Sequence, residues 1–403
     1  MGRRIYYHLT LTLASPLSIG SGEKESTDRD IVLDSRSLPV IPASALAGVF
    51  RHRLYDVSSR LFGRIDGGAE SSDIVFYDGT IVTDSFVTIR DSVALEEGCK
   101  TAVASAKFDL EAAETGAAFE TVIELRDEGC EFSDMVENTI GELNAGLLRI
   151  GSKSTRGYGE VRVTELYKAE FAMPDDADKW LDFDMFSKGS CAYQPCDTAV
   201  TDGGSFIKIT LQLSQRGGIS IRQYTSSKLD NENKGINYQQ MSLSDGTPII
   251  PGTTWAGAFR SRFTELAGGS AEKRDELFGS IKGDGHRSRI YFSESRISGH
   301  TWKKLTRNSI DRFSAKTKDG ALYTERTVFG GKSELNIAVS DITKEEAALL
   351  SAVICDLNNG FLAVGGLTAV GRGLFSVDSL IVNGEDRTDK MNACDIGAML
   401  EVK

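Results

Sequence analysis

The sequence lacks any uninterrupted run of about 18 apolar residues, the length that a helix needs to cross a membrane. This absence excludes a helical membrane protein. The apolar N-terminal stretch is interrupted too, because the odd-numbered residues from Ile5 to Leu13 alternate with Tyr, His and Thr. A period of two residues is typical of a β-strand and not of a signal peptide, so we expect a strand here.

Histidine and cysteine are scarce, with four histidines and six cysteines in 403 residues. Of the cysteines, only Cys191 and Cys196 lie close together in the sequence. Zinc sites need two closely spaced pairs of ligands, which this sequence does not offer, so we expect free thiols in a cytoplasmic protein. Neither a Ser-His-Asp set nor a Cys-His set stands out, and Walker and dinucleotide-binding motifs are absent.

Positive charge is in deficit. The formal net charge is −12 at pH 7, which argues against a nucleic-acid-binding protein if the whole chain is counted. The deficit lies in the first half, where residues 1–199 contain 20 Lys and Arg against 34 Asp and Glu. Residues 200–403 contain 26 against 24 and repel a phosphate backbone less. A nucleic-acid-binding surface would therefore be a local groove.

What the sequence does contain is an internal repeat. Residues 39–53 read PVIPASALAGVFRHR, and residues 248–262 read PIIPGTTWAGAFRSR, 209 residues later. Both copies keep two prolines, the isoleucine between them, an Ala-Gly pair, a phenylalanine and two arginines. A repeat of this length divides the chain into two similar halves.

The same order of predicted elements occurs in both halves: strand, helix, strand, strand, helix, strand. This is the order of an α+β, ferredoxin-like (RRM-like) β-α-β-β-α-β domain. We therefore expect two such domains, over residues 1–170 and 205–403, joined by an acidic linker over residues 171–204. Polar segments at about 89–116 and 299–332 interrupt the domains, and we interpret each as an inserted hairpin that leaves the domain body.

A helix closes each half, over residues 133–145 and 343–359. The second of these helices begins with a capping box, in which Thr343 and Glu346 satisfy each other's backbone N–H groups, and it ends at Gly360.

A glycine-rich loop follows each closing helix. The loops read GSKSTRGYG from residue 151 and GGLTAVGRG from residue 365. Glycines let another backbone come close, and consecutive N–H groups can cradle a phosphate. The alternative is a turn that packs a helix against a strand. The candidate phosphate-binding residues of these loops are Lys153, Arg156, Gly157, Gly159, Gly371, Arg372 and Gly373.

The repeated arginines form a second group of candidates, because a guanidinium matches the geometry of a phosphate. They are Arg51 and Arg53 in the first half and Arg260 and Arg262 in the second. Arg222, at the start of a long polar loop, is a candidate of the same kind. The alternative is a solvated helix face on which the arginines form ion pairs.

The polar loop over residues 20–34 contains five carboxylates within a short stretch and is the first candidate for a metal-binding or catalytic segment. Clustered carboxylates suit Mg²⁺, which binds one or two carboxylates together with substrate phosphate. The alternative is a solvated acidic loop without chemistry. The five carboxylates belong to Glu23, Glu25, Asp28, Asp30 and Asp34.

Together these motifs resemble a known family. A first strand, a loop, a Pro-x-Ile-Pro-x-Ser-x-Leu-x-Gly-x-x-Arg segment, a long insertion and a late glycine-rich loop resemble the RAMP superfamily. They are most similar to the backbone subunits of type III CRISPR effector complexes. The similarity covers both halves, so the chain resembles a tandem fusion of two such subunits, as in type III-D systems.

The resemblance implies a subunit of an antiviral ribonucleoprotein, with guide (CRISPR) RNA, target RNA and other type III effector subunits as partners. The inserted hairpins would be the "thumbs" that part guide from target. In catalytic members, an aspartate of the first loop cuts target RNA with Mg²⁺ and lies six residues before a second aspartate. Asp34 matches the second aspartate, so Asp28 matches the catalytic and metal-binding one, with Asp30 as the fallback. In the second half Asp245 matches the later aspartate, but Gln239 stands six residues earlier, which predicts a single cutting site, in the first half.

Two features depart from the family pattern. Many members have lysine where this chain has Ala47 and Ala256, so the phosphate contact of that lysine is not expected here, and Arg51 and Arg260 remain as candidates for binding phosphate. The negative net charge is also unusual for a protein that lies along RNA. The alternatives left open are a scaffold of the same fold without chemistry, a guide-processing endoribonuclease, which usually needs a histidine, and an unrelated α+β interaction protein.

Overall fold

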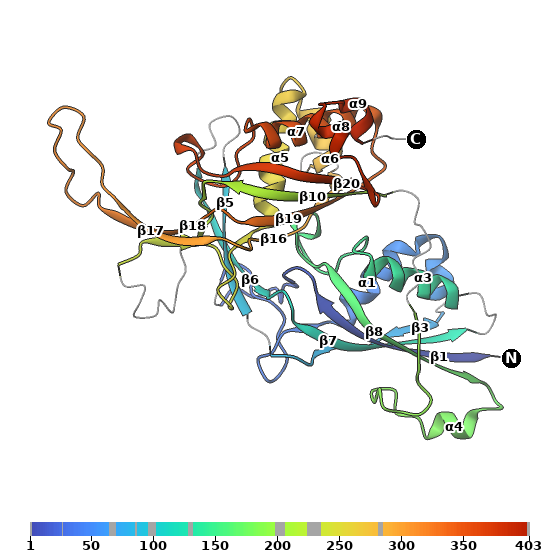
Figure 1. Cartoon of the computed structure of the whole chain (residues 1–403). Coiled ribbons are helices and arrows are strands. Elements are labelled where there is room, and N and C mark those ends of the chain that lie inside the picture. Colours follow the sequence, from blue (N-terminus) through green and yellow to red (C-terminus); the bar gives the residue numbers. More distant parts are fainter. Residues whose placement is uncertain are drawn as a thin grey trace. The chain divides into compact units, whose positions relative to one another are not determined.

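The computed structural model describes residues 2–25, 27–63, 70–84, 87–95, 102–127, 132–197, 206–223, 235–280 and 285–400. Its contacts divide the chain into two compact units. Unit 1 comprises residues 1–89, 109–154 and 158–204, and unit 2 comprises residues 90–108, 155–157 and 205–403. The predicted α+β class is confirmed, since both units combine helices with antiparallel strand pairs (Figure 1).

The sheet of unit 1 is built on its first strand. Strand β1 (Arg3–Leu13) lies between β7 (Ala118–Asp127) and β8 (Val161–Ala172) and is antiparallel to both. The predicted alternation holds, because the odd-numbered side chains of β1 enter the core. The shorter strands of this sheet are β2 (Val40–Ile41), β3 (Ile74–Phe76), β4 (Gly79–Ile81) and β9 (Gln194–Pro195).

Helices pack on one face of this sheet. Helix α1 (Ala43–Arg53) presents Leu46 and Phe50 to the core, and α3 (Ser133–Asn144) presents Val136 and Ile140. Side chains spaced three or four residues apart share one face of a helix, so each helix contributes a continuous apolar stripe. The short helices η1 (Tyr55–Val57) and α2 (Ser58–Leu61) follow α1.

The predicted linker has structure of its own in its described part, residues 171–197. It includes α4 (Ala177–Leu181) and the short strand β9. Phe183 and Tyr193 pack with Tyr6 on the face of the sheet opposite to the helices, and the indole N–H of Trp180 donates to the Tyr6 hydroxyl at 2.9 Å. These residues form an aromatic cover on unit 1, which sequence periodicity did not reveal because most of it is irregular.

The main sheet of unit 2 repeats this plan. Strand β10 (Phe206–Arg216) lies between β19 (Lys332–Ser340) and β20 (Leu374–Val382), and β15 (Ile290–Phe292) pairs with β19. At its other edge β20 pairs with β21 (Glu385–Asp386). The α-helices in the described part of unit 2 are α5 (Gly252–Leu266), α6 (Ala271–Phe278), α7 (Lys344–Asn359), α8 (Thr388–Asn392) and α9 (Ile396–Met399).

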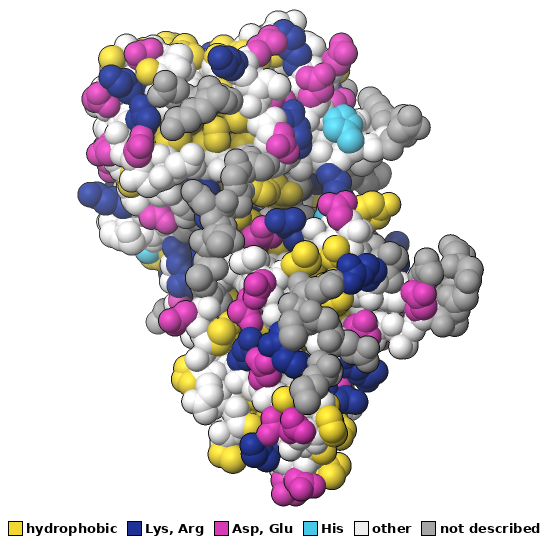
Figure 2. Space-filling view, turned by 90° about the vertical axis from the view of Figure 1, so that its right-hand side faces the viewer, with side chains coloured by type: hydrophobic (Ala, Val, Ile, Leu, Met, Phe, Trp, Pro, Cys, Tyr) yellow, Lys and Arg dark blue, Asp and Glu magenta, His cyan; other side chains and the backbone are white. Residues whose placement is uncertain are grey.

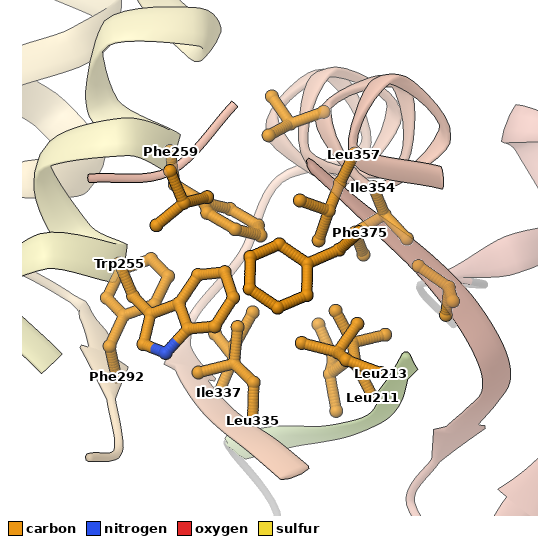
Figure 3. Packing of buried hydrophobic residues seen from close by; sticks show 14 of the residues in the cluster. Leu211, Leu213, Trp255, Phe259, Phe292, Leu335, Ile337, Ile354, Leu357 and Phe375 are labelled. Carbon is orange, nitrogen blue, oxygen red and sulfur yellow. The ribbon is translucent and has the colours of Figure 1, made fainter. Parts of the chain in front are cut away.

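An aromatic cluster fills the core of unit 2. Trp255 and Phe259 of α5 meet Phe292 of β15 and Phe375 of β20, and all four are fully buried (Figure 3). The indole N–H of Trp255 donates to Ser295 Oγ at 3.0 Å, so the buried ring leaves no polar atom unpaired. Burying rings of this size supplies several kcal/mol each, about 25 cal/mol per Å² of apolar surface.

The capping box of α7 is confirmed. Thr343 accepts from the backbone of Glu346, Glu346 accepts from the backbone of Thr343, and Gly360 ends the helix in the left-handed conformation. None of the described helices is long and apolar enough to span a membrane. The four described cysteines, at 191, 196, 355 and 394, are free.

Both polar insertions contain paired strands. In the first half β5 (Val87–Leu95) pairs with β6 (Ala102–Ala113), and residues 96–101 between them lie outside the described part. In the second half β17 (Thr301–Arg307) and β18 (Tyr323–Phe329) form an antiparallel hairpin, whose long loop stands out in orange in Figure 1. A second sheet of unit 2 forms around β18 and adds β11 (Gly218–Ile219), β12 (Arg222–Gln223) and β13 (Tyr238–Gln240). Strand β14 (Ile249–Ile250) pairs separately with β16 (Ser295–Arg296).

His8 lies beneath the aromatic cover of unit 1 and is 2% exposed. Its ring packs edge-on against Tyr193, with centroids 5.6 Å apart. The charged groups that act on it are Glu120, Glu165 and Lys188, and Lys188 bridges the two carboxylates at 3.0 Å each. Burial lowers the pKa of His8 below its ordinary 6.5, so the ring is neutral at pH 7.

This burial predicts a pH dependence of stability. Below pH 6.5 the unfolded chain binds a proton at His8 that the folded chain excludes. The free energy of unfolding therefore keeps its full value above pH 6.5 and decreases as the pH falls below 6.5. The slope approaches about 1.4 kcal/mol per pH unit. In the His8→Gln variant this contribution disappears. Urea unfolding of both proteins between about pH 7 and pH 5 measures the difference, and parallel pH profiles would contradict a neutral His8.

Candidate functional site

The acidic loop of unit 1 follows a fixed backbone path. Val32 N–H donates to the Ile19 carbonyl at 2.9 Å, and Leu33 forms a bridge with Pro39. Between Leu33 and Pro39 the chain makes a tight turn, which is closed by a 2.8 Å hydrogen bond from the Asp34 N–H to the Leu38 carbonyl. Because α1 begins immediately afterwards, the loop is held from both ends.

Two of the loop's carboxylates serve the loop itself. Asp34 accepts backbone N–H bonds from Leu38 and Arg36 and pairs with the Arg36 guanidinium at 2.9 Å. These bonds, the one from Leu38 above all, lower the pKa of Asp34. Asp30 accepts N–H bonds from Glu25 at 2.6 Å and Thr27 at 2.8 Å. Asp30, the fallback for catalysis, is therefore occupied in shaping the turn.

Asp28 is presented differently, since it is exposed and held to a strand. Its Oδ2 accepts the backbone N–H of Asp109 in β6 at 3.1 Å, and its own N–H donates to Asp109 Oδ1 at 2.9 Å. Its neighbour Arg29 is fixed likewise, because Arg29 O accepts the N–H of Glu111 at 3.0 Å. The carboxylate of Asp28 thus has a defined position, while its Oδ1 has no hydrogen bond with the described part of the chain.

The donor set fits Mg²⁺ bound partly by a substrate. The described residues contain no group of three or more Asp, Glu, His and Cys side chains placed to hold a metal by themselves. Mg²⁺ in phosphate chemistry commonly takes one or two carboxylates and completes its shell with phosphate oxygens and waters. The side chains of Asp28 and Asp109 each accept the backbone N–H of the other residue, so two carboxylates belong to one pair of hydrogen-bonded residues. Asp109 was not predicted from the sequence, because 81 residues separate it from its partner.

The same backbone path occurs in the second half. Ser242 forms a bridge with Pro248, as Leu33 does with Pro39, and both pairs are shifted by 209 residues. The turn inside the second bridge is closed by a 2.9 Å bond from the Leu243 N–H to the Thr247 carbonyl. Both turns have the same number of residues, so positions correspond by a constant shift.

This correspondence corrects the sequence register. Counting back from Asp245 places Gln239 opposite Asp28, but the shift of 209 residues places Asn237 opposite Asp28 and Gln239 opposite Asp30. The physical reason is that the two aspartates used for counting sit at different places in equivalent turns. Asp34 is the first residue of its turn and Asp245 the third. Asp230, an aspartate further back in the same polar segment, lies outside the described residues.

Two of the repeated arginines tie helices together. Arg53 of α1 makes a two-pronged contact with Glu142 of α3, at 2.5 and 2.6 Å. Arg262 of α5 contacts Asp356 of α7 at 2.7 Å and also Glu265. The repeated position therefore joins the two main helices in each unit, which favours the ion-pair alternative over phosphate binding.

The other repeated arginines differ from these. Arg51 is exposed, and no ion pair links it to a described residue. Arg260 is half-buried and takes part in interactions of the fold. Arg51 can therefore reach a phosphate without first breaking a contact with the described part of the chain.

One glycine in each glycine-rich loop permits a close backbone contact, as the packing-turn alternative expects. Each loop contains a short helix, η2 (Ser154–Arg156) in the first and η4 (Thr368–Val370) in the second. A Cβ on Gly159 would lie 1.9 Å from the Ile150 carbonyl oxygen, and one on Gly373 would lie 1.9 Å from that of Val364. Only glycine permits so close an approach, and both have positive φ.

The candidate phosphate-binding residues of these loops differ in exposure. Arg372 is 3% exposed and donates to Glu325 and Thr327, so its guanidinium belongs to the core of unit 2. Gly157 is buried, whereas Gly371 is exposed. The exposed Arg156 and the half-buried Lys153, which faces the Tyr158 ring at 6.0 Å, are the cations of these loops that remain at the surface.

The second sheet of unit 2 interleaves cations with aromatic rings, a feature that sequence reasoning missed except for Arg222. That guanidinium lies 4.2 Å from the centroid of the Tyr238 ring, and Tyr238 stacks on Tyr323 at 6.0 Å. Lys303 lies over Phe329 at 4.7 Å. The residues come from β12, β13, β17 and β18. The pairing of β13 with β18 brings the two pairs of strands together, and its partners Tyr238 and Glu325 are 87 residues apart in the sequence.

Charges of both signs are mixed on one face of the molecule. On the face shown in Figure 2, Lys and Arg side chains are scattered among Asp and Glu. This agrees with the expectation that any phosphate-binding surface is local.

Comparisons with known proteins identify the family. The two repeats define a tandem α+β protein, and a sequence model of the RAMP superfamily matches residues 10–162 and 200–376. The chain therefore belongs to the RAMP superfamily. No curated protein sequence matches it. Among solved structures, a similar chain comes from the cryo-EM structure of the Type III-B Cmr-beta bound to cognate target RNA, with 14% identity and a TM-score of 0.35. The match covers 44% of this chain and 61% of that one, less than two thirds of its length.

The different settings of Arg51 and Arg53 can be tested directly. Arg53→Ala leaves Glu142 without its partner, and we expect the free energy of unfolding to fall by about 1 kcal/mol without a change in affinity for single-stranded RNA. Arg51→Ala should leave stability unchanged and reduce the salt dependence of RNA binding by about 0.7 in log–log slope. Urea unfolding and fluorescence anisotropy at several salt concentrations measure both. Equal effects of the two substitutions on RNA affinity would contradict the assignment.

Proposed function

We propose that this chain is a backbone subunit of a type III CRISPR ribonucleoprotein, in which it binds guide RNA, holds the guide–target duplex and cleaves target RNA through Asp28. Its partners would be guide RNA, target RNA and other effector subunits. The observation that carries the proposal is the setting of Asp28. Its neighbours Asp30 and Asp34 are used in shaping the loop, whereas Asp28 is exposed and pinned to β6.

The arrangement of strands supports a ferredoxin-like interpretation of each unit. The order is β3-β7-β1-β8 in unit 1 and β15-β19-β10-β20 in unit 2, with all neighbours antiparallel. In each unit one helix follows the first strand and another follows the third. Such a sheet is a common platform for binding RNA by shape and backbone contacts.

Asp28 and Asp109 are the residues that would hold Mg²⁺, which supplies positive charge beside a phosphate when bound. The carboxylate of Asp28 would orient either a water or the RNA's own 2′-hydroxyl. In the 2′-hydroxyl route, a bond forms between O2′ and phosphorus while the bond from phosphorus to O5′ breaks. The proton of O2′ passes to the Asp28 carboxylate, water protonates O5′, and the products are a 2′,3′-cyclic phosphate and a 5′-hydroxyl.

The second sheet of unit 2 supports contact with RNA. Aromatic rings stack with bases irrespective of sequence, and arginine or lysine beside them attracts the phosphates. Arg222, Tyr238 and Tyr323 form one such group, and Lys303 with Phe329 forms another. The contacts among these groups keep the rings oriented before RNA arrives.

The loop of the β17–β18 hairpin offers an aromatic side chain to a partner. Phe313 is 96% exposed, although Asp311 accepts the N–H groups of Phe313 and Ser314 at 3.0 and 2.8 Å and so fixes the turn. Arg312 and Lys316 flank it. We infer that the hairpin acts as a thumb, in which Phe313 inserts between bases of the guide–target duplex.

The cleavage role is tested with Asp28→Asn in the assembled complex. Asparagine keeps an oxygen for the Asp109 N–H but has no negative charge, so we expect the fold and guide binding to persist while cleavage at one set of positions falls about 100-fold or more. Labelled target RNA is analysed on denaturing gels with Mg²⁺ and with EDTA.

Asp34→Asn serves as the comparison for a carboxylate of the same loop that shapes the turn. We expect this substitution to lower the free energy of unfolding, because the turn loses a charged acceptor, and to leave the rate of cleavage per assembled complex close to that of the wild type. If the Asp28→Asn complex cuts at the same positions and rates as the wild type, Asp28 does not take part in cleavage. This chain would then be better described as a scaffold without chemistry.

The thumb is tested with Phe313→Ser. Loss of one base-stacking contact should weaken target binding by the assembled complex about 5-fold or more. Phe361→Ser is the matched control, because Phe361 is 70% exposed elsewhere in unit 2. Equal affinities of the two variants in filter-binding assays would show that Phe313 does not contact RNA.

A further inference from the structure

The second half retains the loop scaffold of the cleavage site. Within the paired segments, Met241 N–H donates to the Ile221 carbonyl at 2.8 Å, as Val32 N–H does to the Ile19 carbonyl at 2.9 Å. The donors Val32 and Met241 keep the shift of 209 residues, whereas the acceptors Ile19 and Ile221 are 202 residues apart. The second loop is therefore seven residues longer, and the shift of 209 applies to its C-terminal arm, which leads into the turn before α5. The backbone that positions residue 28 in unit 1 therefore has a counterpart that positions residue 237 in unit 2.

Asn237 also repeats the side-chain contact of Asp28. Its Oδ1 accepts the backbone N–H of Thr324 in β18 at 2.8 Å, and its own N–H donates to the Thr324 carbonyl at 2.9 Å. In unit 1, Asp28 Oδ2 accepts the N–H of Asp109 in β6. Both side chains are exposed. Residues 28 and 237 therefore have corresponding backbone paths, each is hydrogen-bonded to a strand of the insertion in its own unit, and both are exposed.

What differs is charge. An asparagine amide oxygen is a neutral acceptor that neither takes a proton near neutral pH nor competes with carboxylates for Mg²⁺. The anchoring residue changes as well, since Thr324 has a hydroxyl where Asp109 has a carboxylate. The position thus keeps the geometry that holds a reactive group and lacks the group itself.

The surroundings of Asn237 suit an RNA strand. The next residue, Tyr238, carries the stacked guanidinium of Arg222 on its ring, and Arg326 lies over Trp302 at 4.3 Å in the same sheet. Residues 200–403 also carry slightly more positive than negative charge, unlike the first half. Loss of the carboxylate is therefore not accompanied by loss of a phosphate-attracting environment.

We propose that unit 2 carries a silenced RNA-cleavage site at Asn237, at which a single-stranded RNA phosphodiester is bound and a carboxylate is missing. The proposal rests on the function assigned to Asp28. The chemistry to be restored is the same balanced step: O2′ bonds to phosphorus, the phosphorus–O5′ bond breaks, and the restored carboxylate takes the O2′ proton while water protonates O5′.

The experiment is a gain of function with Asn237→Asp in the assembled complex. With Mg²⁺ and end-labelled target RNA, we expect a new product at a second position, about 100-fold or more above the wild-type background there. In the double variant that also carries Asp28→Asn, the new product should be the one that persists. Gln239→Asp is the matched control, because it adds the same charge two residues away and should create no cut.

Each outcome decides something. If the wild-type complex makes an Asp28-dependent cut and Asn237→Asp adds none, the silenced site is disproved while the proposed function stands. A new cut with Gln239→Asp instead would overturn the structural register. Failure of the Asn237→Asp complex to assemble would also overturn the inference, which requires this loop to accept a carboxylate. The proposed function would fail in a different way: the wild-type complex would not cleave target RNA, or its cleavage would be unchanged by Asp28→Asn.

Discussion

The short pairing that folds the loop back onto the Pro-x-Ile-Pro segment is the constraint on which the candidate site depends. Leu33 pairs with Pro39 in unit 1, and Ser242 pairs with Pro248 in unit 2. Since a helix begins just after each pairing, the loop residues have fixed distances to the helix on one side and to the inserted strands on the other. A side chain of the loop can therefore change from aspartate to asparagine without moving the backbone that carries it.

Residues that repeat between the halves mostly serve the fold, and residues that differ distinguish what each unit can do. Arg53 and Arg262 both tie the two main helices together. Gly159 and its counterpart in the second loop both permit the same backbone approach. Asp28 and Asn237, in contrast, occupy equivalent places with different chemistry. An internal repeat thus acts as its own control for separating structural from functional roles.

Local signals were predictable from the sequence, and contacts between distant segments were not. The alternation in β1 and the capping box of α7 depend on neighbouring residues, so both could be predicted. The contact of Asp28 with Asp109 depends on a strand of the insertion, and the aromatic cover depends on irregular packing. The register of the second loop was misjudged because an aspartate was counted instead of the backbone turn that contains it.

Net charge says little about the local surface of this chain, because many charged groups of the described residues form ion pairs with each other. The guanidinium of Arg372 forms an ion pair with Glu325. Lys188 forms ion pairs with two carboxylates, those of Glu120 and Glu165. Charges separated by more than about 10 Å are screened from each other at ordinary ionic strength. A phosphate backbone that approached this protein would therefore respond to the local arrangement of exposed cations, such as Arg51, more than to the net charge of the chain.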